Sequence, residues 1–268
     1  MPTVPMPLCR RLSPLALLLL FAAAFAAAQP AAYTKDTATL EYPGFDGSVD
    51  IYRPADGASV GVAIVAHGFT RSRIRHRDLG RALAEAGVTA VIPDLPNVMD
   101  LWGNGQAIVE LVDKLDAGAF GPLPAGRAHL VLIGTSAGGL ATVLAAAKLP
   151  GLAGWIGLDP VDRTGTGADA AARLTSPAIV LLAPAAACNL IGSGRSIARA
   201  VPGLRRAPVI DGASHCDFED PTNRCCEAVC GGSTPAIGAR IRALAVAAAV
   251  ELLAEPAATA RAAAPAPE

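Results

Sequence analysis

The stretch Gly134-Thr135-Ser136-Ala137-Gly138-Gly139 decides how this 268-residue chain is interpreted. It follows an apolar run, His129–Ile133, that predicts a strand, and it opens the alanine-rich segment Ala137–Lys148, which predicts a helix. A G-x-S-x-G turn between strand and helix is so tight that only small residues fit on either side of the serine. It exposes the serine Oγ at the positive end of the helix. Ser136 is therefore the expected nucleophile, and a chance Gly/Ser turn in a chain with 27 glycines is the alternative.

Apolar runs of strand length recur along the chain and alternate with helical segments in its later part. The expected strands are Thr37–Tyr42, Val49–Tyr52, Val60–Ala66, Val88–Ile92, His129–Ile133, Ala153–Leu158, Ala178–Ala183 and Ala207–Ile210. The expected helices are Arg73–Ala86, Gln106–Leu115, Ala137–Lys148 and Ala236–Ala254. Strands that are apolar on both faces, with helices between them, are typical of a parallel sheet covered on both sides. We predict an α/β fold with a mostly parallel eight-stranded sheet, helices on both faces and an antiparallel edge formed by the first two strands.

The two ends of the chain fall outside this pattern. Residues 1–28 predict a secretory signal peptide, because Arg10 and Arg11 precede an apolar run that ends in the small residues 26–28. An uncleaved membrane anchor is the alternative. The folded domain is expected over 29–254, and residues 255–268, rich in alanine and proline, are expected to be a disordered tail. These features predict a secreted or periplasmic protein with no stable membrane anchor after signal cleavage.

Composition and charge exclude other classes of protein. Hydrophobic residues make up 52% of the chain, which indicates a globular domain and not a disordered one. Charged residues make up only 17%, and the formal net charge is −1. Such a chain offers no basic face for phosphate contacts, so we expect no nucleic-acid partner.

A serine nucleophile needs a base, and the chain has four histidines. His76 stands among arginines and predicts a solvated helix face. His129 begins a strand, at the end of the sheet away from the expected nucleophile. His67 follows a strand in a segment that looks like an oxyanion loop. His215 follows the last expected strand, where the chain order serine, acid, histidine places the base, and we expect it to be catalytic.

The acid should lie between the serine and the base in sequence and at the carboxyl end of a strand. Asp159 directly follows the expected strand Ala153–Leu158, and Asp162 lies three residues later. The segment Pro184–Asn189, which follows the next strand, contains no carboxylate. Asp159 is therefore the expected acid, with Asp162 as the alternative.

Two further sets of residues are expected near the nucleophile. The backbone N–H groups of Phe69 and Ala137 should form the oxyanion hole, and Gly68 would let the chain pass close to the reacting carbonyl. The Phe69 ring could also serve in packing. Met99 and Trp102, beyond the fourth expected strand, are predicted to bind an apolar part of the substrate, although Trp102 could instead be a helix-packing residue.

Five cysteines remain after the signal segment: Cys188, Cys216, Cys225, Cys226 and Cys230. In an oxidising compartment they predict two disulfides and one leftover thiol. If the seventh and eighth strands are neighbours, a Cys188–Cys216 bridge would fix the candidate base, and the second pair would come from the other three. A metal site is the alternative, but the spacing contains no C-x2-C pair, so no structural zinc is expected. Serine catalysis requires no metal or organic cofactor.

Four blocks resemble the α/β-hydrolase superfamily, and within it the chlorophyllase-like and dienelactone-hydrolase-type branch. They are His67–Phe69, Gly134–Gly139, Ile156–Val161 and Ala213–Phe218. The third is similar to the segment around the catalytic acid of chlorophyllases, which favours Asp159. The resemblance implies hydrolysis of a small-molecule or lipid-like ester through an acyl-enzyme. A polyester or lipid hydrolase, and a catalytically silent secreted binding protein on the same fold, are the alternatives.

Overall fold

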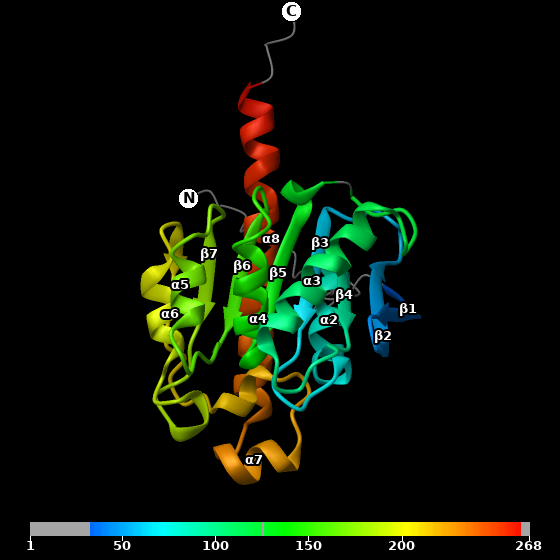
Figure 1. The fold of residues 1–268 in the computed structure, drawn as a ribbon. Helices are drawn as coiled ribbons and strands as arrows, with labels where there is room; N and C mark the ends of the chain where they lie inside the picture. Colours follow the sequence, from blue (N-terminus) through cyan, green and yellow to red (C-terminus); the bar gives the residue numbers. More distant parts are fainter. Residues whose placement is uncertain (1–32, 125, 264–268) are drawn as a thin grey trace, which may run out of the picture. The chain divides into compact units, whose positions relative to one another are not determined.

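The computed structural model describes residues 33–124 and 126–263, with side chains through Glu255. Its centre is an eight-stranded sheet in the order β1-β2-β4-β3-β5-β6-β7-β8 (Figure 1). The strands are β1 (Tyr33–Tyr42), β2 (Phe45–Pro54), β3 (Gly61–Ala66), β4 (Val88–Pro93), β5 (Leu130–Thr135), β6 (Gly154–Leu158), β7 (Ala178–Leu181) and β8 (Leu204–Arg206). β1 and β2 form an antiparallel edge and the strands from β4 to β8 run parallel, as predicted. The segment 1–28, expected to be a signal peptide, lies outside the described residues.

Helices cover both faces of the sheet. They are α2 (Arg77–Glu85), α3 (Leu101–Asp116), α4 (Ala137–Ala146), α5 (Thr166–Ala171), α6 (Gly194–Ala200), α7 (Arg224–Cys230) and α8 (Pro235–Ala263). Short 3-10 turns are η2 (Arg73–His76), η3 (Arg127–His129), η4 (Ala187–Asn189) and η5 (His215–Phe218). Helices α3, α4, α5 and α6 share one hydrophobic core, and α2 and α8 share the other (Figure 1). No helix in the described part of the chain combines the length and apolarity that a bilayer crossing requires.

The alternation of side chains along β3 shows why these strands are apolar throughout. Val62 and Ile64 point into the core under α3 and α4, whereas Ala63 and Val65 point into the core under α2 and α8. Successive side chains of a strand face opposite sides of the sheet, so a strand buried on both faces has no polar positions. This continuous apolarity makes the parallel sheet predictable from the sequence.

Several predicted elements have different bounds in the structure, and the last strand and α3 show why. The last strand is β8, three residues before the predicted Ala207–Ile210, and the later segment contributes only an isolated parallel bridge between Val209 and Leu182. Pro208 lacks the N–H group that a regular strand donates. Helix α3 begins at Leu101, five residues before the predicted start, because the Asp100 carboxylate caps it by accepting from the Gly103 N–H at 2.8 Å.

Helix α8 also departs from the prediction at its carboxyl end. It continues through Ala263, whereas disorder was expected from Glu255 onward. The segment 257–263 is mostly alanine, which has the highest helix propensity of the amino acids. The prediction relied on apolar periodicity, which a polyalanine-like extension lacks. Residues 264–268 lie outside the described part of the chain.

His76 contradicts the prediction of a solvated helix face. Its side chain is fully buried, and neither ring nitrogen has a hydrogen-bond partner among the described residues. The flanking arginines satisfy their charges elsewhere: Arg73 pairs with Asp50 and Asp94, and Arg75 donates to the Thr222 carbonyl oxygen. His76 is therefore buried although its neighbours in sequence are charged, because those neighbours bind partners in other elements.

Candidate active site

Ser136 lies in a sharp turn between the end of β5 and the start of α4. Its backbone has φ 55° and ψ −122°, a strained conformation for a residue with a side chain. A Cβ on Gly134 would lie 2.3 Å from the Gly138 carbonyl oxygen, and a Cβ on Gly138 would lie 2.4 Å from the Ala66 carbonyl oxygen. Only glycine fits at either position, which is the steric requirement that the G-x-S-x-G spacing implies.

The structure brings Ser136, His215 and Asp159 together from three loops at the carboxyl end of the sheet. The His215 Nε2 lies 2.9 Å from the Ser136 Oγ, and its Nδ1 lies 2.6 Å from the Asp159 Oδ2. An ionised carboxylate can only accept, so the imidazole donates its Nδ1–H to Asp159 and leaves Nε2 free to accept the serine O–H. This is the arrangement that a general base and its orienting acid require.

The alternative acid, Asp162, does not reach His215. Its carboxylate accepts backbone N–H groups from Thr164, Gly165 and Ala168, at 2.9 to 3.3 Å. It therefore orders the loop that leads into α5. Asp159, by contrast, is 1% exposed, and its Oδ1 also accepts the Ala183 N–H at 3.0 Å.

The loop that carries His215 is anchored on both sides. The Asp217 Oδ2 accepts the Ser214 N–H at 2.7 Å, and its Oδ1 accepts the Thr234 N–H at 2.9 Å. One buried carboxylate thus connects η5 to the chain that enters α8. The next residue after the histidine, Cys216, is joined to α7 by a disulfide.

The segments that carry the two predicted oxyanion donors, Phe69 and Ala137, adjoin Ser136 and line the same cleft. A Cβ on Gly68 would be 3.2 Å from the Ser136 Cβ, which places the loop after β3 directly against the serine. Ala137 is the first residue of α4, so its N–H has no partner within the helix. The Phe69 N–H has no acceptor among the described residues. Two unengaged backbone donors therefore flank Ser136.

His67 holds this loop in place and is not a candidate base. Its Nε2 accepts the Leu95 N–H at 3.0 Å, and its Nδ1 lies 2.9 Å from the Gly68 carbonyl oxygen. Both bonds together require the neutral ring with the proton on Nδ1. Burial lowers the pKa of His67, outweighing the hydrogen bond to Gly68 and the charge of Asp94, and so favours that neutral form.

A cleft of about 780 Å³ opens above Ser136 and His215. Met99 and Trp102 line it, as does Phe69, so the structure places the predicted binding residues at the cleft. Trp102 is half-exposed, and the Lys148 Nζ lies 5.6 Å from its ring centroid. Several other residues that no sequence motif marks also line the cleft, among them Val98, Arg163, Thr164 and Leu190. The last three lie beyond the carboxyl ends of β6 and β7, where the strand-end rule would have found them.

The disulfides correct the predicted Cys188–Cys216 bridge. Cys188 pairs with Cys230 and Cys216 pairs with Cys226, which leaves Cys225 exposed as the free thiol. The pairing depends on α7, a helix that the sequence pattern does not predict. Cys226 and Cys230 lie four residues apart and therefore on the same side of α7. This one side of the helix bonds to Cys216 in the loop of His215 and to Cys188 in the loop after β7.

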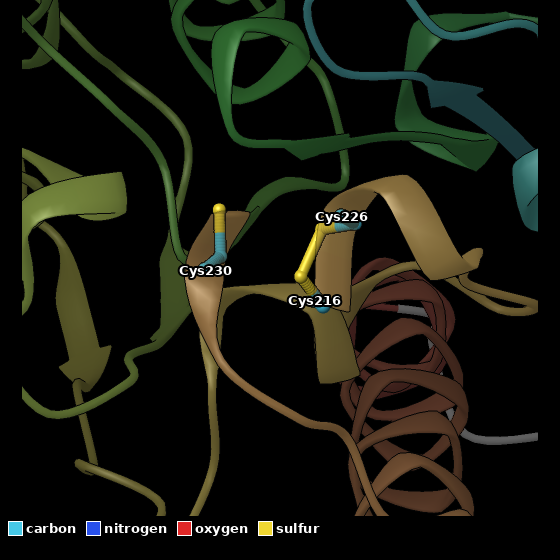
Figure 2. Close-up of side chains that lie close together, drawn as sticks. All are labelled: Cys216, Cys226 and Cys230. Carbon is cyan, nitrogen blue, oxygen red and sulfur yellow. A yellow bond between two sulfur atoms is a disulfide. The ribbon is translucent and has the colours of Figure 1, made fainter. Parts of the chain in front are cut away.

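The two bridges lie next to each other. Figure 2 shows the Cys216–Cys226 bridge with the Cys230 sulfur beside it, and the sulfurs of these three residues lie within 4.8 Å of one another. Metals bind thiolates, and here the sulfurs are consumed in disulfides. The cluster therefore serves as a covalent connection at the rim of the cleft.

Comparison with known proteins supports the fold. No protein-family model matches the chain, and no curated protein matches it. Among solved structures, a dienelactone hydrolase from Anabaena variabilis ATCC 29413 superposes with a TM-score of 0.64, covering 82% of this chain and 98% of that one. The two sequences are 17% identical. The chain therefore has an α/β-hydrolase fold of the dienelactone-hydrolase type, which the sequence blocks implied.

Proposed function

We propose that this protein is an exported serine hydrolase that cleaves carboxylic esters through an acyl-enzyme intermediate. The observation that carries the proposal is the hydrogen-bonded chain from Ser136 through His215 to Asp159, which opens onto the cleft. The structural likeness to a dienelactone hydrolase supports a hydrolase on this fold.

In the proposed mechanism, the Ser136 Oγ attacks the ester carbonyl carbon while His215 Nε2 takes the serine proton. Asp159 accepts from Nδ1 and stabilises the imidazolium that forms. The backbone N–H groups of Phe69 and Ala137 donate to the oxyanion of the tetrahedral intermediate. His215 then gives its proton to the departing alcohol, and a water molecule activated by the same histidine releases the acid. No step needs a metal or an organic cofactor.

The lining of the cleft favours an ester with a bulky apolar group, in keeping with a chlorophyllase-like hydrolase. Among its lining residues, Met99 is 78% exposed, Val98 is 55% exposed, and Phe69 and Trp102 are each 48% exposed. Apolar side chains left in water around a cleft are typical of a binding surface. They also favour a second candidate, a polyester or lipid hydrolase that acts on insoluble substrate. Faster turnover of emulsified or solid ester than of the dissolved form would select this candidate.

Export to the periplasm or the medium is part of the proposal. Two disulfides persist in oxidising compartments and are rare where thiols are kept reduced. The expected signal peptide would lead the chain there. The proposed partner is a small-molecule or lipid-like ester, with no nucleic acid and no stable membrane anchor after signal cleavage.

Substitution of the candidate acid, Asp159, tests the mechanism, and the nearby Asp162 provides a matched control. Turnover of p-nitrophenyl esters from short to long acyl chains would be measured for the wild type, Asp159→Asn and Asp162→Asn. We expect kcat to fall by about 10⁴-fold in Asp159→Asn, since the amide disfavours the required tautomer. Asp162→Asn should retain most of the activity. Equal losses in both variants would contradict the assignment, and an inactive, correctly oxidised wild type would favour a silent binding protein.

A further inference from the structure

Asn189 is a fully buried polar residue that touches the candidate acid. It is 0% exposed and ends η4, in the loop beyond the carboxyl end of β7. Its Nδ2 donates to the Asp159 Oδ2 at 3.1 Å and to the Pro184 carbonyl oxygen at 2.9 Å. The segment Pro184–Asn189 contains no carboxylate, and in the structure the neutral amide at its end faces Asp159.

The Asp159 carboxylate has three donors that together determine its orientation. Oδ1 accepts the Ala183 N–H at 3.0 Å, and Oδ2 accepts from both His215 and Asn189. Without the amide, the histidine would be the side-chain donor left on Oδ2, and the carboxylate could rotate about its Cβ–Cγ bond. The position of the imidazole over Ser136 depends on that carboxylate, so a looser acid gives a less aligned base.

The other end of the amide holds Asn189 itself in place. Its Oδ1 accepts the Ala186 N–H at 2.9 Å and the Gly192 N–H at 2.8 Å. These bonds span a turn in which Leu190 and Ile191 both have positive φ, 48° and 57°. Two consecutive side-chain-bearing residues in this region are strained and need support from their surroundings.

A covalent path joins this loop to the loop of the base. Cys188, next to Asn189, is bonded to Cys230, and Cys216, next to His215, is bonded to Cys226 of the same helix α7. Asn189 and His215, which both donate to the Asp159 Oδ2, are therefore each adjacent to a half-cystine, and the partner cysteines both belong to α7; Figure 2 shows both, Cys226 and Cys230. The disulfides restrict how far the two loops can separate.

We infer that Asn189 is a positioning residue, which orients the Asp159 carboxylate toward His215 and is held by the disulfide-linked helix α7. The inference rests on the proposed function for its effect on turnover. It goes beyond that function because it assigns a fourth residue to the hydrogen-bonded chain. Asn189 does not line the cleft, so its contribution lies in kcat and not in KM.

Asn189→Asp keeps the acceptor Oδ1 and replaces the NH2 group, which donates to Asp159 and to the Pro184 carbonyl oxygen, by a second oxygen. Two carboxylate oxygens about 3 Å apart cannot both be ionised at low cost, so the pair with Asp159 shares a proton and titrates as a unit. When protonated, the new side chain has one O–H group, which can donate to Asp159, and the Pro184 carbonyl oxygen then has no donor from this side chain at any pH. The ionisable group that otherwise contacts Asp159 among the described residues is His215, which is common to wild type and variant.

The test is the ratio of kcat for Asn189→Asp to kcat for the wild type across the pH range of activity. We expect the ratio to fall by about 10-fold or more as pH rises, the effect of losing a hydrogen bond to a charged group, with KM unchanged. Asn104→Asp is the matched control, since the Asn104 side chain is also buried and, among the described residues, bonds only to the backbone of Asn97. Its ratio should not vary with pH. A pH-independent ratio in Asn189→Asp would overturn the inference.

A second measurement tests the positioning role of Asn189 without relying on ester turnover. The low-field NMR signal of the His215 Nδ1 proton, identified by its absence in His215→Gln, reports the bond to Asp159 whether or not the protein turns over an ester. We expect it to shift in folded Asn189→Asp relative to the wild type, and an unchanged signal would contradict the positioning role. An inactive wild type with a shifted signal would refute the proposed esterase and retain the positioning of Asp159.

Discussion

Lowering the pH should destabilise the protein through His76, and a single substitution can isolate this effect. The side chain is fully buried, and this burial lowers its pKa from 6.5 to about 3. In the unfolded chain His76 is therefore protonated as the pH falls through 6.5, whereas in the folded protein it stays neutral until about pH 3. Because the unfolded chain binds the proton more readily, the free energy of unfolding decreases as the pH falls from 6.5 toward 3. Above pH 6.5 His76 is neutral in both states and causes no such loss.

The size of the effect follows from the two pKa values. At about pH 4.5, roughly two pH units below the unfolded value, the lost stability is about 2.7 kcal/mol, at about 1.36 kcal/mol per unit. That is a large fraction of the 5 to 15 kcal/mol that typically holds a domain folded, about a fifth to a half.

Urea unfolding of wild type and His76→Leu at about pH 7.5 and about pH 4.5 measures this loss. Leucine is similar in size and does not titrate, so the wild type should lose about 2.7 kcal/mol more than the variant between the two conditions. Carboxylates that protonate in acid contribute to both proteins and cancel in the difference. His129→Leu is the control and should behave as the wild type does. Equal losses in wild type and His76→Leu would refute the account of this histidine.

Two further predictions concern the support of the site. Gly138→Ala should reduce kcat and destabilise the protein by about 1 to 3 kcal/mol in thermal unfolding, because the added Cβ meets two backbone carbonyl oxygens at 2.4 Å. Gly232→Ala, where a Cβ meets nothing within 4 Å, should do neither. Replacing Cys188 and Cys230 by serine should lower the free energy of unfolding by about 4 kcal/mol, the chain entropy of a bridge that spans 42 residues. Cys225→Ser, which removes the free thiol, should leave unfolding unchanged, and equal stabilities of these variants would contradict the role of the bridge.

The sequence predicts the sheet well because burial on both faces makes β3 to β7 almost entirely apolar. The candidate nucleophile, base and acid follow from the same sheet, since Ser136, His215 and Asp159 each lie in the segment that follows a predicted strand. Ser136 is additionally marked by glycines that steric contact requires, and these are visible as letters in the sequence.

What the sequence did not predict depends on contacts between segments far apart in the chain. Asn189 carries no motif, and its role arises only when the loop after β7 folds against Asp159. The disulfide pairing was missed because it depends on α7, a seven-residue helix too short to show a period. His76 was misplaced because its arginine neighbours bind partners in other elements, which local charge does not reveal.

The most direct test of the account is labelling of the purified, oxidised protein with a fluorophosphonate probe, beside Ser136→Ala. A serine activated by His215 should react, and peptide mass spectrometry should place the label on Ser136. Ser136→Ala should remain unlabelled, whereas Ser233→Ala, outside the cleft, should label as the wild type does. Absence of labelling in folded wild type, or labelling that persists in Ser136→Ala, would contradict the serine-hydrolase assignment.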